Sequence, residues 1–165
     1  MGLISFLKTV GRKLHLGGDE PAAAPTPQGP TPEQIKDLHD RRRAAAVVKL
    51  IQEMGFTVDE LGVRVDGDNV TLTGTAKTQE EREKIVLLVG NVEGTAAVDD
   101  QFTVAEVAPE AQYYEVQKGD TLWKIATHFY GNGSKYPVIF EANKPMLKDA
   151  DEIYPGQKLR IPPQS

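Results

Sequence analysis

The chain is 165 residues long, carries a formal net charge of −5 and contains no cysteine. A disulfide framework and a lipid-modified cysteine are therefore excluded, and no apolar run approaches the roughly 20 residues that a membrane-spanning helix needs. The acidic balance, with one arginine cluster at residues 41–43 and no interleaved aromatics, argues against a nucleic-acid partner. The hydrophobic content of 39% is enough for two small domains to bury a core each.

Residues 1–16 predict a short amphipathic helix. Such a helix could lie on a membrane surface or pack on the protein's own core, and we favour the core because nothing else supplies a second, stable membrane anchor. The apolar run is too short, and is interrupted by a lysine, to be a secretory signal, so we expect a cytoplasmic protein. A linker rich in proline and alanine follows over residues 17–32. The apolar stripe of the predicted helix contains Leu3, Phe6, Leu7, Val10 and Leu14.

Residues 33–105 predict the order helix, strand, strand, helix, strand. The first helix ends at Gly55 and carries the arginine cluster on its solvated face. A hairpin turns at residues 66–69, and Thr78 caps the second helix. The acidic turn does not follow the EF-hand calcium pattern. The sequence VTLTGTA … VGNVEGTAAVDDQ, within this region, resembles the BON domain.

After a short linker at residues 106–111, residues 112–163 predict the order strand, helix, helix, strand. Gly131 ends the first helix, and the last strand covers residues 158–161. The opening at residues 114–122 and the closing signature YPGQKLRIP resemble the LysM domain. That resemblance implies a shallow groove for N-acetylglucosamine glycans such as peptidoglycan. The groove would be formed by Gly119, Asp120, Thr121, Leu122, Ile153, Tyr154, Pro155 and Gly156.

The whole chain, apart from its linker, resembles the BON–LysM family of bacterial cytoplasmic potassium-binding proteins. The resemblance rests on the start Met-Gly-Leu-x-x-Phe-x-Lys-x-x-Gly-x-Lys-Leu followed by the two domains in this order. It implies an α+β fold and a potassium sensor of osmotic or salt stress, with no catalysis. We expect the protein to be a monomer. The proline- and alanine-rich stretch at residues 17–32 looks longer than the family's usual connection.

Potassium binding calls for several neutral oxygens, because clustered carboxylates favour divalent ions. The loop at residues 90–95 follows a helix, and the last carbonyls of a helix lack intrahelical partners and carry partial negative charge. Glycines at both ends of the loop could turn carbonyls inward. With the resemblance, this predicts backbone ligands to K+ from Leu7, Val10, Gly90, Val92 and Thr95, with Gly11, Asn91 and Gly94 shaping the loop.

Other interpretations stay open on the sequence alone. The loop could be an ordinary glycine-bearing connection between a helix and a strand. The protein could instead bind peptidoglycan fragments through the LysM groove, or act as an adaptor for other proteins. Trp123 could stack on a sugar, although packing is the more common role of a lone aromatic. No catalytic triad or phosphate-binding loop is present in the sequence.

Overall fold

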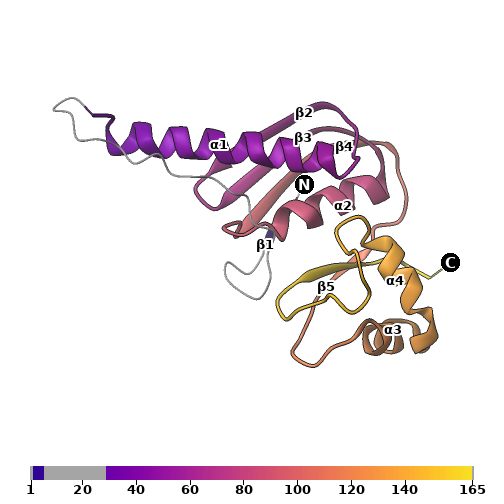
Figure 1. Cartoon of the computed structure of the whole chain (residues 1–165). Helices are drawn as coiled ribbons and strands as arrows, with labels where there is room; N and C mark the ends of the chain where they lie inside the picture. The colour runs from indigo at the N-terminus through magenta and orange to yellow at the C-terminus, as the bar shows by residue number, and fades with distance from the viewer. Residues whose placement is uncertain (1, 6–28, 165) are drawn as a thin grey trace.

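The computed structural model describes residues 2–5 and 29–164 (Figure 1). Within these residues two units follow one another along the chain. The first has a four-stranded sheet with two α-helices, and the second has a two-stranded sheet with two α-helices and a short 3-10 turn. This is the α+β class that the sequence predicts.

The first unit has the predicted order of helix, strand, strand, helix and strand. Its sheet has the strand order β1-β4-β3-β2, with β3 and β4 parallel and the other neighbours antiparallel. Both helices pack on the sheet through one hydrophobic core. The elements are α1 (Pro32–Glu53), β2 (Val58–Asp66), β3 (Asn69–Thr78), α2 (Gln79–Gly90) and β4 (Ala97–Glu106).

Local capping explains where these helices begin and end. Thr31 and Gln34 form a capping box at the start of α1, each side chain bonding the other residue's N–H. Gly55, just past the end of α1, has a φ of +85°, which glycine adopts at little cost. Thr78 accepts a hydrogen bond from the N–H of Glu81 and caps α2, as predicted.

The start of the chain corrects one prediction. Gly2–Ser5 form a strand, β1, which pairs antiparallel with the edge of β4, whereas the sequence predicted a helix through these residues. A short isolated helix is only marginally stable in water. The edge of β4 has unpaired backbone N–H and C=O groups, and these four residues can bond to them as a strand. The rest of the predicted helix, and nearly all of the predicted linker, lie outside the described residues.

The second unit has the predicted order of strand, helix, helix and strand. Gly131 ends the first of its helices with a φ of +68°, as predicted. The last strand has the predicted bounds. Its elements are β5 (Gln112–Glu115), α3 (Leu122–Tyr130), the 3-10 turn η1 (Gly133–Lys135), α4 (Tyr136–Ala142) and β6 (Lys158–Ile161), with β5 and β6 antiparallel.

Candidate cation-binding site

The loop between α2 and β4 carries most of the predicted potassium ligands. Asn91 caps α2, and its N–H donates to the carbonyl of Leu87 at 3.1 Å. The N–H of Thr95 donates to the carbonyl of Val92 at 3.1 Å, which closes the loop into a tight turn. Val92 and Thr95 are fully buried, so the loop is fixed against the core of the first unit.

One of the two loop glycines adopts the backbone angles expected of it. Gly94 has a φ of +84°, in the left-handed region that favours glycine. Gly90 is the last residue of α2 and its φ is not positive. Of the two glycines that could turn carbonyls inward, Gly94 therefore uses this backbone freedom, whereas Gly90 keeps the conformation of the helix that ends at it.

β1 brings the N-terminal segment to this loop. Ser5 lies opposite Ala97, which follows Thr95 by two residues. The pairing is antiparallel, so β1 ends beside the first residue of β4, next to the loop, rather than at the other end of β4. The remaining predicted ligands, Leu7 and Val10, and the shaping residue Gly11 lie outside the described residues.

Arg43 of α1 holds the loop and the β2–β3 hairpin together. Its Nη2 donates to the carbonyl of Gly94 at 3.1 Å, and its Nη1 donates to the carbonyl of Gly67 in the hairpin turn. The N–H of Ala96 also donates to the carbonyl of Asp68 at 2.8 Å. The sequence placed this arginine on a solvated face; its two neighbours in the cluster are exposed, but Arg43 is half-buried.

Asp40 lies one turn before Arg43 and binds the other side of the same hairpin. Its Oδ1 accepts from the N–H of Gly67 at 3.2 Å, and its Oδ2 accepts from Nζ of Lys36 at 2.9 Å. Burial by itself would raise the pKa of Asp40, but these two hydrogen bonds outweigh burial and hold the pKa below its ordinary value. Hydrogen bonds to Asp66 and Asp40 in turn raise the pKa of Lys36.

Sequence reasoning missed these two side chains, although a signal was present. Asp40 and Arg43 continue, at spacings of three and four residues, the buried stripe formed by Val47 and Ile51. Charged residues on the buried stripe of a helix need polar partners. Such a pattern predicts contact with turns of the domain rather than with solvent.

Asn91 points toward the second unit. Its Nδ2 donates to the carbonyl of Lys158 at 3.1 Å, and its Oδ1 accepts from the N–H of the same residue at 3.2 Å. The same Nδ2 also lies within bonding distance of the carbonyl of Leu87 and of Sδ of Met146. The residue predicted to shape the loop thus connects the loop to β6.

A buried ion pair joins the two units next to this contact. Nε of Arg160, on β6, donates to Oε2 of Glu83, on α2, at 2.5 Å, and both side chains are buried. The other oxygen of Glu83 accepts from Nε2 of Gln79 and from the N–H of Ala111, each at 3.0 Å. Every oxygen of this carboxylate therefore has a donor, as a buried charge requires.

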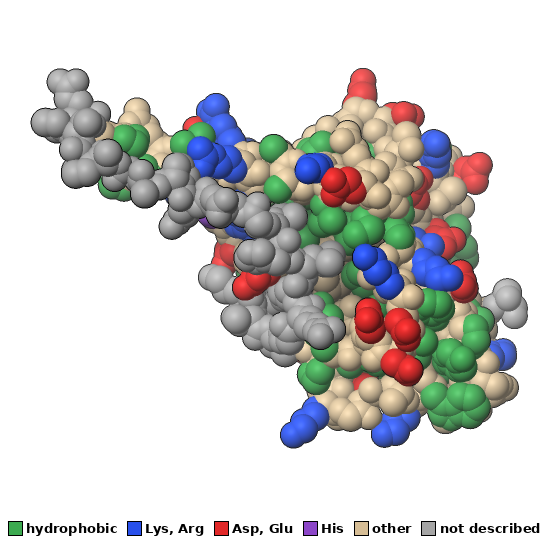
Figure 2. Space-filling model, in the orientation of Figure 1, with side chains coloured by type: hydrophobic (Ala, Val, Ile, Leu, Met, Phe, Trp, Pro, Cys, Tyr) green, Lys and Arg blue, Asp and Glu red, His purple; other side chains and the backbone are tan. Residues whose placement is uncertain are grey.

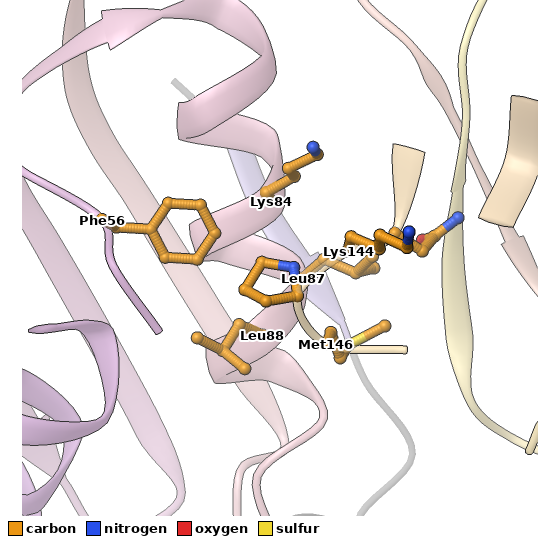
Figure 3. A pocket seen from close by; sticks show the side chains of 8 residues that line it. Phe56, Lys84, Leu87, Leu88, Lys144 and Met146 are labelled. Atoms are coloured by element: carbon orange, nitrogen blue, oxygen red, sulfur yellow. The ribbon is translucent and has the colours of Figure 1, made fainter. Parts of the chain in front are cut away.

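The apolar part of the same contact is shown in Figure 3. Side chains of α2 and the turn before β2 meet the residues that follow α4, and the hollow between them has no room for a water molecule. This contact is an interface between the units and not a ligand pocket. It is lined by Phe56, Lys84, Leu87, Leu88, Asn143, Lys144, Pro145 and Met146.

The second of the two loops predicted to form the glycan groove is tied to Val116, which lies just after β5. The N–H of Val116 donates to the carbonyl of Gln157, and the N–H of Gly156 donates to the carbonyl of Val116, both at 2.8 Å. Gly156 has a φ of +86° and is buried. Gly156, at the end of the second predicted groove loop, is therefore bonded to the strand end that precedes the first loop.

Several of the predicted groove residues have structural roles. The carboxylate of Asp120 accepts from the hydroxyl of Tyr114 at 2.6 Å and from the N–H of Gln117 at 2.8 Å. The first of these bonds raises the pKa of Tyr114 to about 12. Thr121 caps α3, and Leu122 is buried in the core of the second unit. The remaining groove residues are exposed or half-buried: Gly119, Ile153, Tyr154 and Pro155.

Trp123 packs within the second unit rather than against the first. Its ring lies on Gly133, where an added Cβ would come 2.3 Å from the indole, and its centroid is 6.3 Å from that of Tyr136. It is still 55% exposed, and Val138 of α4 is 47% exposed. Figure 2 shows hydrophobic side chains gathered at the surface over this region, while acidic and basic groups are interspersed elsewhere on that face.

The fold is that of a two-domain protein with a BON domain followed by a LysM domain. The sequence matches the BON domain family over residues 39–106 and the LysM domain family over residues 114–162. It is 40% identical, over 98% of this chain and 99% of the relative, to the potassium binding protein Kbp of Escherichia coli O6:H1 (strain CFT073). The chain therefore belongs to the BON–LysM family that includes this potassium binding protein.

Two more distant relatives are longer proteins. An uncharacterized protein of Deinococcus radiodurans is 33% identical over 82% of this chain, which spans 56% of that protein. The resuscitation-promoting factor Rpf of Micrococcus luteus is 30% identical over 79% of this chain and 57% of its own length. Similarity to these two proteins leaves nearly half of each unmatched.

Two features are absent from the described residues. No group of three or more His, Cys, Asp or Glu side chains among them is placed to hold a metal ion. No helix in residues 29–164 is long and apolar enough to cross a membrane.

Proposed function

We propose that this protein is a cytoplasmic, non-enzymatic K+ binder whose ligands are backbone carbonyls of the loop after α2 and of the N-terminal segment. The observation that carries this proposal is the register of β1, which ends at Ser5 opposite Ala97 and so beside the loop. The similarity to a potassium binding protein over nearly the whole chain supports the choice of ion. The proposed ligands are Leu7, Val10, Gly90, Val92 and Thr95.

The donors in the described part of the loop suit a large monovalent cation. K+ is matched by several neutral oxygens, and the carbonyls at the end of α2 carry partial negative charge. The carbonyl of Val92 accepts one hydrogen bond from Thr95 and has a second lone pair for a cation. The carboxylate cluster that a divalent ion prefers is not found among the described residues.

We propose that the LysM domain stabilises the ion-bound form. Asn91 gives this idea a physical basis, because one residue belongs to the loop and also bonds the backbone of Lys158 in β6. An ion that crosslinks the N-terminal segment to the loop would stabilise the fold. Once the ion concentration exceeds the dissociation constant, the added free energy of unfolding grows with the logarithm of that concentration. Such a response is what a sensor of osmotic or salt stress requires.

Replacement of Gly94 by alanine tests the site. A Cβ at Gly94 would be 3.4 Å from Nη2 of Arg43, at a φ of +84°. We expect the loop to relax away from this strain, which at about 1–2 kcal/mol corresponds to a loss of roughly tenfold in K+ affinity. The measurement is calorimetric titration with KCl at constant ionic strength.

The matched control is Gly119→Ala. Gly119 has a nearly identical φ of +86° and nothing within 4 Å of an added Cβ, but it lies in the LysM domain. It should lose similar stability and keep the K+ affinity of the parent protein. Unchanged affinity in a folded Gly94→Ala protein would show that the loop is the wrong place.

The second candidate function is glycan binding, which the match to the LysM domain favours. Against it, Asp120 and Leu122 already serve the fold, as hydrogen-bond acceptor and core residue. Titration with N-acetylglucosamine oligomers distinguishes the two functions. Binding that is lost on replacing Tyr154, and that is indifferent to K+, would favour the groove.

A further inference from the structure

The helices of the LysM domain present apolar side chains to solvent. Trp123 of α3 is 55% exposed and Val138 of α4 is 47% exposed, and Figure 2 shows hydrophobic side chains gathered at the surface over these helices. We propose that this surface docks reversibly on the headgroup region of an anionic lipid bilayer. The surface, called the α3–α4 face below, consists of Trp123, Lys124, Lys135, Tyr136, Pro137 and Val138.

The indole of Trp123 is held in place while more than half of its surface stays free. The ring lies on Gly133, where an added Cβ would come 2.3 Å from the indole, and its centroid is 6.3 Å from that of Tyr136. A large ring that is already fixed loses little rotamer freedom when a partner covers it. Trp and Tyr combine an apolar body with a polar tip, which suits the boundary between lipid headgroups and acyl chains.

The charges of the α3–α4 face complement an anionic surface. Residues 121–140 contain no Asp or Glu, although the chain has 24 of them. The same stretch contains Lys124 and Lys135, which are both exposed. Lys124 donates to the carbonyl of Gly119, and neither lysine forms an ion pair with a carboxylate of the described residues. Both positive charges are therefore available to an anionic partner.

The two domains differ in charge, and this difference favours an extended surface as the partner. Residues 112–163 carry seven basic and six acidic side chains, whereas residues 33–105 carry nine basic and fourteen acidic ones. An anionic bilayer therefore repels the BON domain and turns the LysM domain toward itself. A short acidic peptide touches only the α3–α4 face and gains nothing from this orientation. The LysM domain is thus the end of the molecule that an anionic bilayer admits.

The test adds two kinds of vesicle to the full-length protein: phosphatidylcholine alone, and phosphatidylcholine with phosphatidylserine in equal parts. Trp123 is the one tryptophan of the sequence, so its emission reports on the α3–α4 face. We expect the emission to shift to the blue, and the protein to co-sediment, with the mixed vesicles. With phosphatidylcholine alone we expect neither effect, because the lysines then have no anionic partner.

A pair of double variants tests the role of the two lysines. Lys124→Gln with Lys135→Gln keeps the tryptophan and should lower the partition coefficient by roughly 30-fold, because each lysine near an anionic bilayer contributes about fivefold. Lys49→Gln with Lys77→Gln is the matched control. It changes the net charge equally by replacing two exposed lysines of the BON domain, and it should keep nearly all of the binding.

Each outcome decides for or against the α3–α4 face. Absence of co-sedimentation of the parent protein with the mixed vesicles would overturn the inference. Co-sedimentation without a shift in Trp123 emission would place the contact elsewhere on the chain and overturn it as well. An equal loss of binding in the two double variants would show that net charge, and not this face, controls binding. A blue shift with poly-glutamate and none with the mixed vesicles would assign the face to an acidic peptide instead.

Discussion

At the scale of single residues, the hairpin turn between β2 and β3 is held by two oppositely charged side chains of one helix. Asp40 accepts from the N–H of Gly67, and Arg43 donates to the carbonyl of the same residue. Arg43 then extends the contact to Gly94 in the loop after α2. Through these two residues α1 adds side-chain contacts to two turns that the backbone bond from Ala96 to Asp68 already joins.

Replacement of Asp40 by asparagine should expose the contribution of its charge. The pKa of Asp40 is lowered in the folded protein, so the carboxylate stabilises the fold above its ordinary pKa of about 3.9, and this stabilisation is lost as pH falls through the folded value. We expect the variant to lose about 1–2 kcal/mol at pH 7, because a hydrogen bond to a charged group is weakened.

Urea unfolding at several pH values measures this effect. The difference in unfolding free energy between the parent protein and Asp40→Asn should shrink as the pH is lowered below about 4. A difference that stays constant from neutral to acidic pH would show that the charge of Asp40 contributes nothing.

At the scale of elements, α2 and β6 form the junction of the molecule. The edge of β6 that does not face β5 is covered by two asparagines, each bonding both the N–H and the carbonyl of one strand residue. Asn91 binds Lys158 and Asn143 binds Arg160, and each follows the C-terminal end of a helix. The two amides act as a partner strand would and protect an otherwise open sheet edge.

The ion pair between Glu83 and Arg160 should be a large contributor to this junction. Glu83→Gln removes one partner and leaves a buried guanidinium without its counter-charge, which typically costs about 3–5 kcal/mol. Glu53→Gln is the control, because it breaks the exposed pair with Lys49 and should cost less than about 1 kcal/mol.

Unfolding in urea gives both values under the same conditions. The double variant Glu83→Gln with Arg160→Met should recover part of the loss, since it removes the unpaired charge. Equal costs for Glu83→Gln and Glu53→Gln would contradict a structural role for the buried pair.

At the scale of the whole molecule, what could be predicted from the sequence is what depends on local signals. The order of elements in both domains, the cap at Thr78 and the helix end at Gly131 follow from residues that lie within a few positions of one another. The bounds of β6 follow from the turn at residues 155–156 and the alternating residues after it.

What the sequence could not predict depends on contacts between distant positions. β1 exists because Gly2–Ser5 meet the edge of β4, so a pairing across more than ninety positions replaced the predicted helix. The pair of Glu83 and Arg160 is separated by 77 positions, and each residue alone reads as an ordinary surface charge. Arg43 belongs to the same group, since its partners Gly67 and Gly94 lie on two remote turns.

The central claim, that the loop beside β1 binds K+, is tested most directly by calorimetric titration of the dialysed full-length protein with KCl and, separately, NaCl. Ionic strength is held constant with the salt of a bulky organic cation, so that screening does not change during the titration. We predict saturable binding of K+ and none of Na+. Absence of binding by either ion would contradict the account and direct attention to peptidoglycan fragments and the LysM groove.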